Sequence, residues 1–149
     1  MRHADAASRK AWQDDDVLRP LTTKGERQAA ALVRLLDGVT IRRVLSSPAV
    51  RCVQTVQPLA EERGLAVERT DLLAEGAPLD TAWKLLRTEA AQGAAVLCAH
   101  GDLIPDLLDE VRREGASCDA PQWAKGSTWA LAWDGDRFTT ATYFPPQSA

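Results

Sequence analysis

The sequence predicts an α/β fold: a three-layer α/β/α sandwich around a mostly parallel sheet, with an antiparallel strand at its C-terminal end. Three observations predict it. Short apolar strand candidates alternate with amphipathic helices along residues 23–113, one of these strands is a continuous apolar run, and the chain closes on a hairpin signal. A chain of 149 residues suits one hydrophobic core, so we expect a single domain over residues 1–149.

The first helix is expected at residues 23–37. Thr23 and Glu26 have the spacing of a capping box, apolar residues then recur at helical intervals, and Gly38 ends the pattern. Residues 41–45 form a short apolar strand candidate directly after this helix. This pair begins the alternation from which the fold class is predicted.

The second helix is expected to begin at Ser47 and Pro48, with Ser47 as N-cap and Pro48 at the first helical position. It should end at Gly64, and a second strand candidate follows at residues 65–68. A third helix is expected at residues 79–91. Strands and helices in this order form βαβ units, which place the strands in parallel.

Residues 94–99 are the continuous apolar run, which is typical of a strand buried on both faces of its sheet. A helix is expected at residues 104–113. Residues 128–133 and 137–144 flank Asp134-Gly135-Asp136, a strong turn signal between two strands. These two strands are the antiparallel close of the predicted sheet.

Composition excludes several classes of partner. The net charge of −3 and the pI of about 5.4 argue against a nucleic-acid polymer, because binding to a phosphate backbone needs a basic face. The apolar runs are too short to cross a bilayer and no signal peptide precedes Arg2, so no membrane partner is expected. The three cysteines lack metal-ligand spacing, which predicts no metal, no cofactor and a reducing, cytoplasmic location.

The chain has two histidines, and both occupy informative positions. His3 follows Arg2 at the start, and His100 ends the buried strand and is followed by Gly101 and a helix. Ligands of open parallel sheets bind at the carboxyl ends of strands, where a helix N-terminus favours an anion. His100 therefore lies where a phosphate could bind. The alternative is a strand-end histidine that only packs, and by itself His100 fits that reading better.

Arg51 is expected in the first turn of the second helix, where a cation opposes the helix dipole. An anionic ligand would remove this conflict. A solvated surface arginine explains the position equally well when Arg51 is considered alone.

Five groups of residues occur in an order and spacing that resemble the histidine phosphatase superfamily, also called phosphoglycerate-mutase-like. The absence of a long insertion makes the chain similar to the small SixA-type branch. Residues 104–107 and 125–129 are also similar to the histidine phosphatase domain of mycobacterial MutT-type Nudix hydrolases, which suggests association with a Nudix-type domain. The five groups are Arg2-His3-Ala4, Arg19-Pro20-Leu21-Thr22 with Gly25, Ser46-Ser47-Pro48 with Arg51 and Thr55, Glu75, and His100-Gly101.

The resemblance implies a role for each matching residue. His3 would attack phosphorus and become phosphohistidine, and Glu75 would protonate the leaving group. The phosphoryl oxygens would be bound by Arg2, Arg51 and His100, with a further hydrogen bond from Thr22 or Ser8. A neutral imidazole is a fair nucleophile near pH 7, and guanidinium groups match the charge on the transferring phosphoryl group.

The start of the chain departs from the family pattern. The family nucleophile ends the first strand, yet only Met1 precedes Arg2 here, so the first strand is missing from the pattern. Three explanations are open: a start that lies further upstream, a fragment, or another segment in the place of the strand. The first is favoured. If the chain does begin at Met1, we expect a mobile His3 and weak or absent activity.

The substrate has three readings. The segment between Glu75 and His100 is short, which predicts an open site suited to a phosphohistidine protein or a small phosphomonoester, the leading hypothesis. The first alternative is a nucleotide, including an oxidised one, whose base could stack on Trp12, although packing explains Trp12 better. The second alternative is an inactive phosphate-binding or docking module. All three require a phosphorylated partner.

Overall fold

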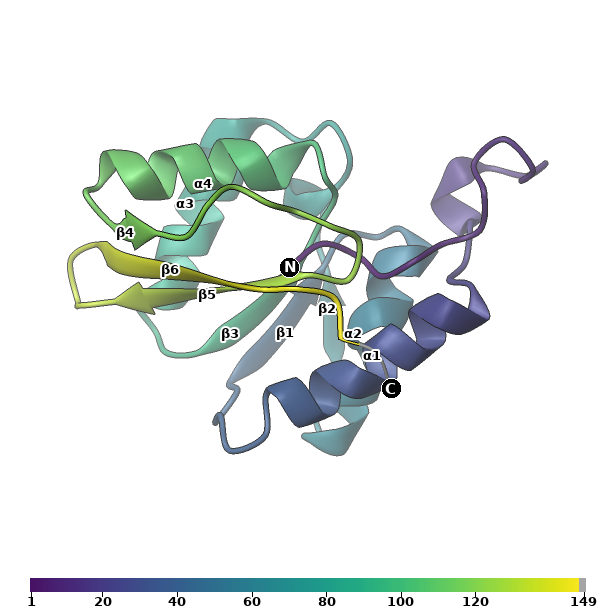
Figure 1. Ribbon diagram of the computed structural model, residues 1–149, viewed down its shortest axis with the longest axis horizontal. Helices are drawn as coiled ribbons and strands as arrows, with labels where there is room; N and C mark the ends of the chain where they lie inside the picture. Colours follow the sequence, from purple (N-terminus) through teal and green to yellow (C-terminus); the bar gives the residue numbers. More distant parts are fainter. Residues whose placement is uncertain (148–149) are drawn as a thin grey trace.

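The computed structural model describes residues 1–147 and has the α/β architecture that the sequence predicts (Figure 1). Helices and strands alternate up to α4, and three strands follow it. The elements, in chain order, are η1 Asp16–Leu18, α1 Thr23–Leu35, β1 Arg43–Ser46, α2 Val50–Glu62, β2 Val67–Arg69, η2 Asp71–Leu73, α3 Leu79–Ala90, β3 Ala95–Cys98, α4 Leu103–Arg113, β4 Ser117–Cys118, β5 Thr128–Trp133 and β6 Phe138–Phe144.

The strands form two sheets of three strands each. The first has the order β2-β1-β3 and is parallel, with Val44 opposite Val67 on one side and Val96 on the other. The second has the order β4-β6-β5, in which β6 pairs parallel with β4 and antiparallel with β5. The predicted antiparallel pairing of the last two strands is therefore confirmed, whereas the strands form two sheets instead of the single sheet that we expected.

Residues Met1 to His3 lie between the two sheets, and the N-terminus is at the centre of the molecule (Figure 1). Arg2 forms a parallel bridge with Ala99 at the end of β3, and its backbone N–H donates to the carbonyl of Ser127, just before β5, at 3.1 Å. Within the described residues, His3 is thus preceded by this isolated bridge and not by a named strand. This agrees with the first strand being missing from the sequence pattern.

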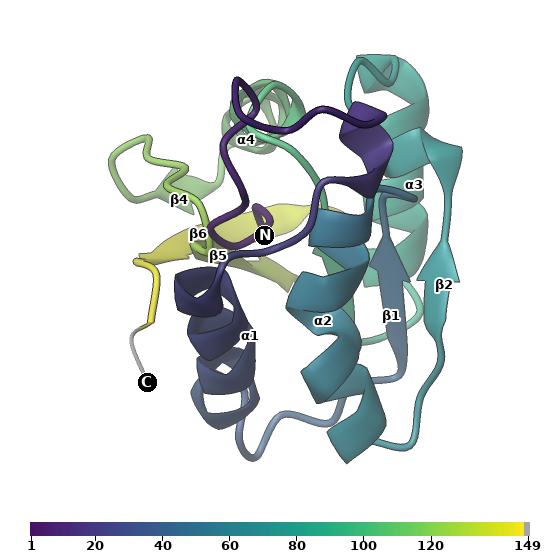
Figure 2. The ribbon, with the colours of Figure 1, turned by 90° about the vertical axis from the view of Figure 1, so that its right-hand side faces the viewer.

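The helices cover both faces of the β2-β1-β3 sheet (Figure 2). Helices α1 and α2 pack on one face, where Val44 and Leu59 are buried. Helices α3 and α4 pack on the other face, where Leu45 and Ala82 are buried. Because neighbouring side chains on a strand point to opposite faces, Val44 and Leu45 fill the two cores in turn. None of the helices within residues 1–147 is long and apolar enough to span a bilayer.

Several element boundaries differ from the prediction. The N-cap of α1 is Thr22, whose hydroxyl accepts from the N–H of Gly25, so the expected capping box at Thr23 is wrong by one residue. Helix α2 begins at Val50 instead of at Pro48, and its N-cap is Ala49, whose N–H donates to the Ser47 hydroxyl. In strand β3, Ala95 to Leu97 are half-buried and only Cys98 is buried. The prediction that this strand is buried on both faces is therefore wrong for its first three residues.

Candidate active site

The two histidines come together at the carboxyl ends of the central strands. His100 directly follows the bridge residue Ala99, and His3 follows the bridge residue Arg2 on the neighbouring segment. Their ring centroids lie 5.4 Å apart in an edge-on arrangement, and the residues are only 4% and 3% exposed. Residues that are almost a hundred positions apart in the chain therefore share one buried site.

The ring of His3 and the backbone next to it are hydrogen-bonded. Its Nδ1 lies 2.8 Å from the carbonyl oxygen of Ala4, so Nδ1 carries the proton and Nε2 keeps its lone pair. The N–H of Ala4 donates to the Thr55 hydroxyl at 2.9 Å, which ties this loop to α2. Burial, together with the smaller effects of nearby His100 and Arg51, lowers the pKa of His3 to about 3, against the opposing effect of the Ala4 carbonyl. The imidazole is therefore neutral near pH 7.

His100 is oriented from both sides of its ring. Its Nε2 lies 2.8 Å from the hydroxyl oxygen of Ser47, and its Nδ1 lies 3.4 Å from Nη2 of Arg51. In the tautomer that satisfies both contacts, Nε2–H donates to Ser47 and Nδ1 accepts from Arg51. The hydroxyl of Ser47, which also accepts from the N–H of Ala49 at 3.3 Å, is thus a positioning group for His100.

Ser47→Ala is expected to lower kcat on a phosphate substrate on the order of 10- to 100-fold, because His100 loses the contact that fixes its ring. Ser46→Ala is the matched control, since the Ser46 hydroxyl is equally buried but donates to a backbone carbonyl. Both variants should lose a similar stability, about 1 kcal/mol. Steady-state kinetics and urea unfolding of the pair test this expectation. Equal activities of the two variants would contradict the role of Ser47.

Two guanidinium groups flank the histidines, that of the buried Arg51 and that of the half-buried Arg2. Arg51 is 1% exposed, and its Nη2 is 3.1 Å from a carboxylate oxygen of Asp16 and 3.4 Å from one of Glu75. The guanidinium of Arg2 donates to the carbonyl of Trp123 at 2.9 Å. The Nε atoms of both arginines are buried and have no hydrogen-bond partner within the part of the chain that the structure describes. Buried donors without partners are costly, and an anion bound here would satisfy them.

Gly101 makes room for the Arg2 guanidinium. A Cβ atom at this position would lie 2.7 Å from Cζ of Arg2, closer than such contacts occur. The glycine after His100 therefore lets the guanidinium lie flat against the backbone where β3 turns into α4.

A pocket of about 590 Å³ opens at this end of the sheets. Of the residues that the sequence singles out, Arg2, His3, Ser8, Glu75 and His100 line it. Arg51 contacts His100 and Glu75 without lining the pocket itself. Its remaining lining residues include four cations, one further carboxylate and an aromatic ring: Arg9, Lys10, Arg19, Lys125, Asp102 and Trp123.

Two of the candidates from the sequence lie elsewhere. Thr22 is outside the pocket, because its hydroxyl caps α1 and donates to a carboxylate oxygen of Asp5 at 2.6 Å. Trp12 is also outside it, with its indole N–H donating to the carbonyl of Asp15, so loop packing is the correct reading of this side chain. The tryptophan that does line the pocket is Trp123, from the loop before β5.

The sequence reasoning missed the cations around the pocket. Arg9 lies 3.0 Å from a carboxylate oxygen of Glu75, and Lys125 comes from a loop more than a hundred residues further on. Single basic residues in loops carry no recognisable pattern. Two of them lay in segments that resemble the family, Arg19 at the start of one of the five groups and Lys125 at the start of residues 125–129, but neither was given a role. Arg19 is 3% exposed, with Nη1 donating to the carbonyl of Ala7.

Comparison with known proteins places the chain among phosphatases. Residues 1–78 match the sequence profile of the histidine phosphatase superfamily (branch 1). The chain is 33% identical over 151 aligned positions to an 8-oxo-(d)GTP phosphatase from Mycolicibacterium smegmatis, covering 98% of this chain and 47% of the relative. The chain thus spans about half the length of that relative.

Solved structures share the fold. The protein histidine phosphatase SixA, complexed with tungstate, superposes with a TM-score of 0.77 at 24% identity, covering 99% of this chain and 94% of the other. A SixA described as a putative phosphohistidine phosphatase from Agrobacterium tumefaciens gives a TM-score of 0.75 at 22% identity, covering 98% and 96%. With the profile match over more than half of its length, the chain belongs to branch 1 of the histidine phosphatase superfamily.

Proposed function

We propose that this protein removes a phosphoryl group from nucleoside di- or triphosphates, oxidised guanine nucleotides among them, through a phosphohistidine on His3. The observation that carries the chemistry is the pair of buried imidazoles beside two guanidinium groups with unsatisfied N–H donors. The nucleotide class is supported by the cations around the pocket and by the relative named 8-oxo-(d)GTP phosphatase.

In the first step, Nε2 of His3 attacks phosphorus in line with the leaving oxygen. The N–P bond forms as the P–O bond breaks, and Glu75, on the pocket wall, donates a proton to the leaving oxygen when that oxygen needs one. In the second step, water attacks the phosphohistidine, its proton passes to Glu75, and inorganic phosphate leaves with His3 restored. The neutral state of His3 suits it to the first step, because a protonated imidazole has no lone pair to donate.

Arg2, Arg51 and His100 would bind the equatorial oxygens of the transferring group. Charge on these oxygens must be balanced in the transition state, and loss of one preorganised donor in such sites costs roughly 10²–10³ in rate. Arg51 already contacts Asp16 and Glu75. These carboxylates hold the guanidinium in place before the substrate arrives, at the expense of part of its charge. Ser8 lines the pocket and would add a hydrogen bond to a phosphate oxygen.

The surroundings of the site favour a substrate with more than one phosphate. Five cationic side chains line the pocket against two carboxylates, Glu75 and Asp102. A single phosphoryl group is fully served by Arg2, Arg51 and His100, so the exposed Lys10 and Lys125 have charge to offer a second phosphate. Trp123 presents a ring on which a base could stack.

A phosphohistidine protein is the second candidate substrate. The chain between Glu75 and His100 is taken up by α3 and β3, so this segment does not fold over the pocket. A pocket open on that side admits a protein surface as well as a nucleotide.

The double variant Lys10→Ala/Lys125→Ala tests the proposed substrate class. We expect kcat/KM for a nucleoside diphosphate to fall about 10-fold, mainly through KM, and kcat/KM for p-nitrophenyl phosphate to change less than about twofold. Lys84→Ala, an exposed lysine on α3, is the control. Equal losses on both substrates would contradict a second phosphate site. Turnover of a phosphohistidine protein without turnover of nucleotides would favour the second candidate.

A further inference from the structure

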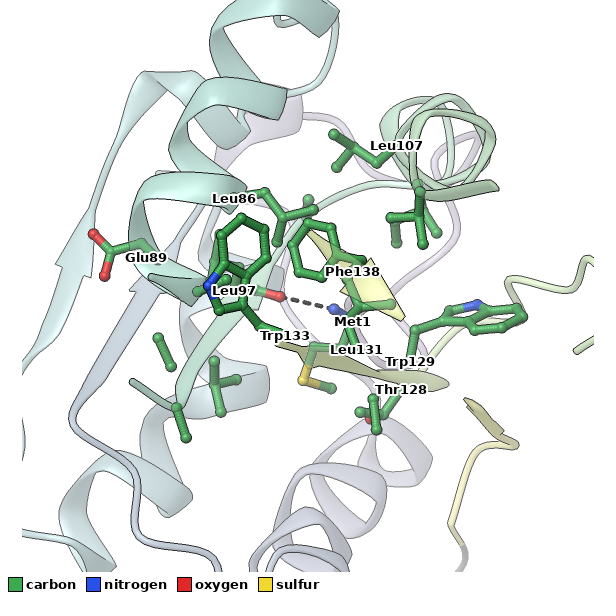
Figure 3. Close-up of a pocket in the computed structure, with 18 of the residues that line it drawn as sticks. Met1, Leu86, Glu89, Leu97, Leu107, Thr128, Trp129, Leu131, Trp133 and Phe138 are labelled. Atoms are coloured by element: carbon green, nitrogen blue, oxygen red, sulfur yellow. Dashed lines mark hydrogen bonds between the residues drawn. The ribbon is translucent and has the colours of Figure 1, made fainter. Parts of the chain in front are cut away.

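Asp102 lines the phosphate pocket, and the proposed mechanism gives it no role. The other large hollow of the molecule is an apolar cavity of about 500 Å³ between the two sheets. Of the described residues that line that cavity, Glu89 alone has a charged side chain, and its carboxylate turns away to Arg42 and Arg43 (Figure 3). Asp102 stays in its pocket although a carboxylate repels the anion bound there, which indicates a gain that offsets the repulsion.

Asp102 occupies the N-cap position of α4 without capping the helix. An aspartate at an N-cap ordinarily accepts a hydrogen bond from a backbone N–H two or three residues further on. The Asp102 side chain makes no such bond. Its Oδ2 instead accepts from the N–H of Gly76 at 2.7 Å, which joins the start of α4 to the loop after η2. Asp102 thus replaces a stabilising local contact by a contact with a distant segment of the chain.

The partner of Asp102 lies at the centre of a tight turn. The N–H of Ala77 donates to the carbonyl of Ala74 at 3.0 Å, and Gly76 has a φ of 79°, the left-handed conformation that the third position of a type II turn requires. Glu75 is at the second position of this turn. The N–H of Gly76 takes no part in closing the turn, and it belongs to the peptide group that joins Glu75 to Gly76. A hydrogen bond to this N–H therefore fixes the backbone from which the Glu75 side chain projects.

The side-chain contacts of Glu75 do not fix its position by themselves. Its carboxylate contacts Arg9 at 3.0 Å and Arg51 at 3.4 Å, but the side chains of Glu75 and Arg9 are 44% and 61% exposed. An exposed ion pair holds its partners only weakly. Arg51 is buried, yet the proposed mechanism turns its N–H groups to the phosphoryl oxygens. The position of Glu75 therefore depends on its backbone, which the buried Leu73 holds on one side and Asp102 on the other.

We infer that Asp102 is a positioning residue for Glu75: through the N–H of Gly76 it sets the place of the carboxyl group that protonates the leaving oxygen. The inference rests on the proposed function, in which Glu75 is the proton donor. Asp102 acts through the backbone of the turn and not on the substrate. Because Asp102 closely follows His100 in the chain, one hydrogen bond ties the proton donor to the segment that binds the phosphoryl group.

The test uses two esters whose leaving oxygens differ in their need for a proton. p-Nitrophenolate leaves readily without one, whereas the more basic phenolate of phenyl phosphate depends on a general acid. The kcat/KM of each ester is measured, because this quantity covers the first transfer and not the hydrolysis of the shared phosphohistidine. The ratio of kcat/KM for phenyl phosphate to that for p-nitrophenyl phosphate is independent of the folded fraction and of any change in anion affinity that both esters share.

Asp102→Ala should lower this ratio about 10-fold, because a displaced general acid loses part of its effect on the rate. Asp102→Asn keeps an oxygen that accepts from the N–H of Gly76, so its ratio should stay within about twofold of wild type. Asp106→Ala is the matched control, since it removes the same charge from an exposed position in the first turn of the same helix, and it should leave the ratio unchanged. Glu75→Gln should lower the ratio at least as far as Asp102→Ala.

A wild-type ratio in Asp102→Ala, beside a lowered ratio in Glu75→Gln, would overturn the positioning role and leave the proposed function standing. Equal losses in Asp102→Asn and Asp102→Ala would also overturn it, because the charge and not the hydrogen bond would then matter. An unchanged ratio in Glu75→Gln, or a wild-type protein that hydrolyses neither ester, would refute the proposed role of Glu75 and the positioning role with it.

Amide hydrogen exchange of Gly76 tests the contact without any turnover. Exchange should be about 10-fold faster in Asp102→Ala than in Asp106→Ala, because only the first variant removes the acceptor. Equal exchange rates in these two variants would overturn the inference whatever the activities are.

Discussion

His3→Ala is expected to abolish phosphate hydrolysis, with kcat lowered roughly 10⁴-fold or more. The variant removes the atom that bonds to phosphorus, and His100 is not placed to replace it, because its Nε2 contacts Ser47 and its Nδ1, which contacts Arg51 before the substrate arrives, is the atom proposed to bind a phosphoryl oxygen. Initial rates on an aryl phosphate and on a nucleoside diphosphate measure the effect.

A trapping experiment shows whether the loss of activity comes from the loss of the phosphohistidine intermediate. Wild-type protein quenched during turnover of a labelled substrate should carry an acid-labile, alkali-stable phosphoryl group, and His3→Ala should carry none. His3→Asn, whose amide can still donate to the Ala4 carbonyl, is the control for the loop conformation and should be equally inactive. A His3→Ala protein that retains wild-type turnover would refute the phosphohistidine mechanism.

Gly25→Ala is expected to lower the free energy of unfolding by about 3 kcal/mol. A Cβ atom at Gly25 would lie 1.9 Å from the carbonyl oxygen of Asp5 and 2.9 Å from its carbonyl carbon. The obstacle is backbone, so α1 and the loop that carries His3 must move apart. That loop is held to α1 by the hydrogen bond from the N–H of Thr22 to the same Asp5 oxygen, which the shift would break.

Urea unfolding of Gly25→Ala measures this effect, and Lys24→Ala at the exposed neighbouring position is the control, with a change within about 0.5 kcal/mol. Because the displaced loop leads to His3, kcat should fall in the fraction that remains folded. A Gly25→Ala protein as stable as wild type would mean that α1 and the loop are not in close contact in solution.

The fold was predictable where short-range patterns decide it. The periodic apolar residues of α1 to α4 and the Asp134-Gly135-Asp136 turn lie within the elements that they predict. The boundaries failed where a side chain has a distant partner: Ser47 was expected to cap α2, but its hydroxyl contacts His100. The burial of Leu97 was also misjudged, because an apolar run does not reveal that one edge of the strand has no neighbour.

The candidate site shows the same division. His3, His100 and Arg51 were found through the ordered resemblance to the family pattern, because His100 and Arg51 considered singly fit a structural role as well or better. Lys125 and Trp123 were missed because their place at the pocket depends on how a distant loop folds back on the bridge of residues 1–3.

The two imidazoles of the site are also the only ones in the chain. Isotope labelling of histidine alone would therefore give a spectrum in which every ring signal originates from the pocket, with no background to subtract. Phosphorylation at Nε2, a change of tautomer, or the arrival of an anion would each move one of just two sets of resonances. Because the chain has only two histidines, their ring signals report directly on the state of the site.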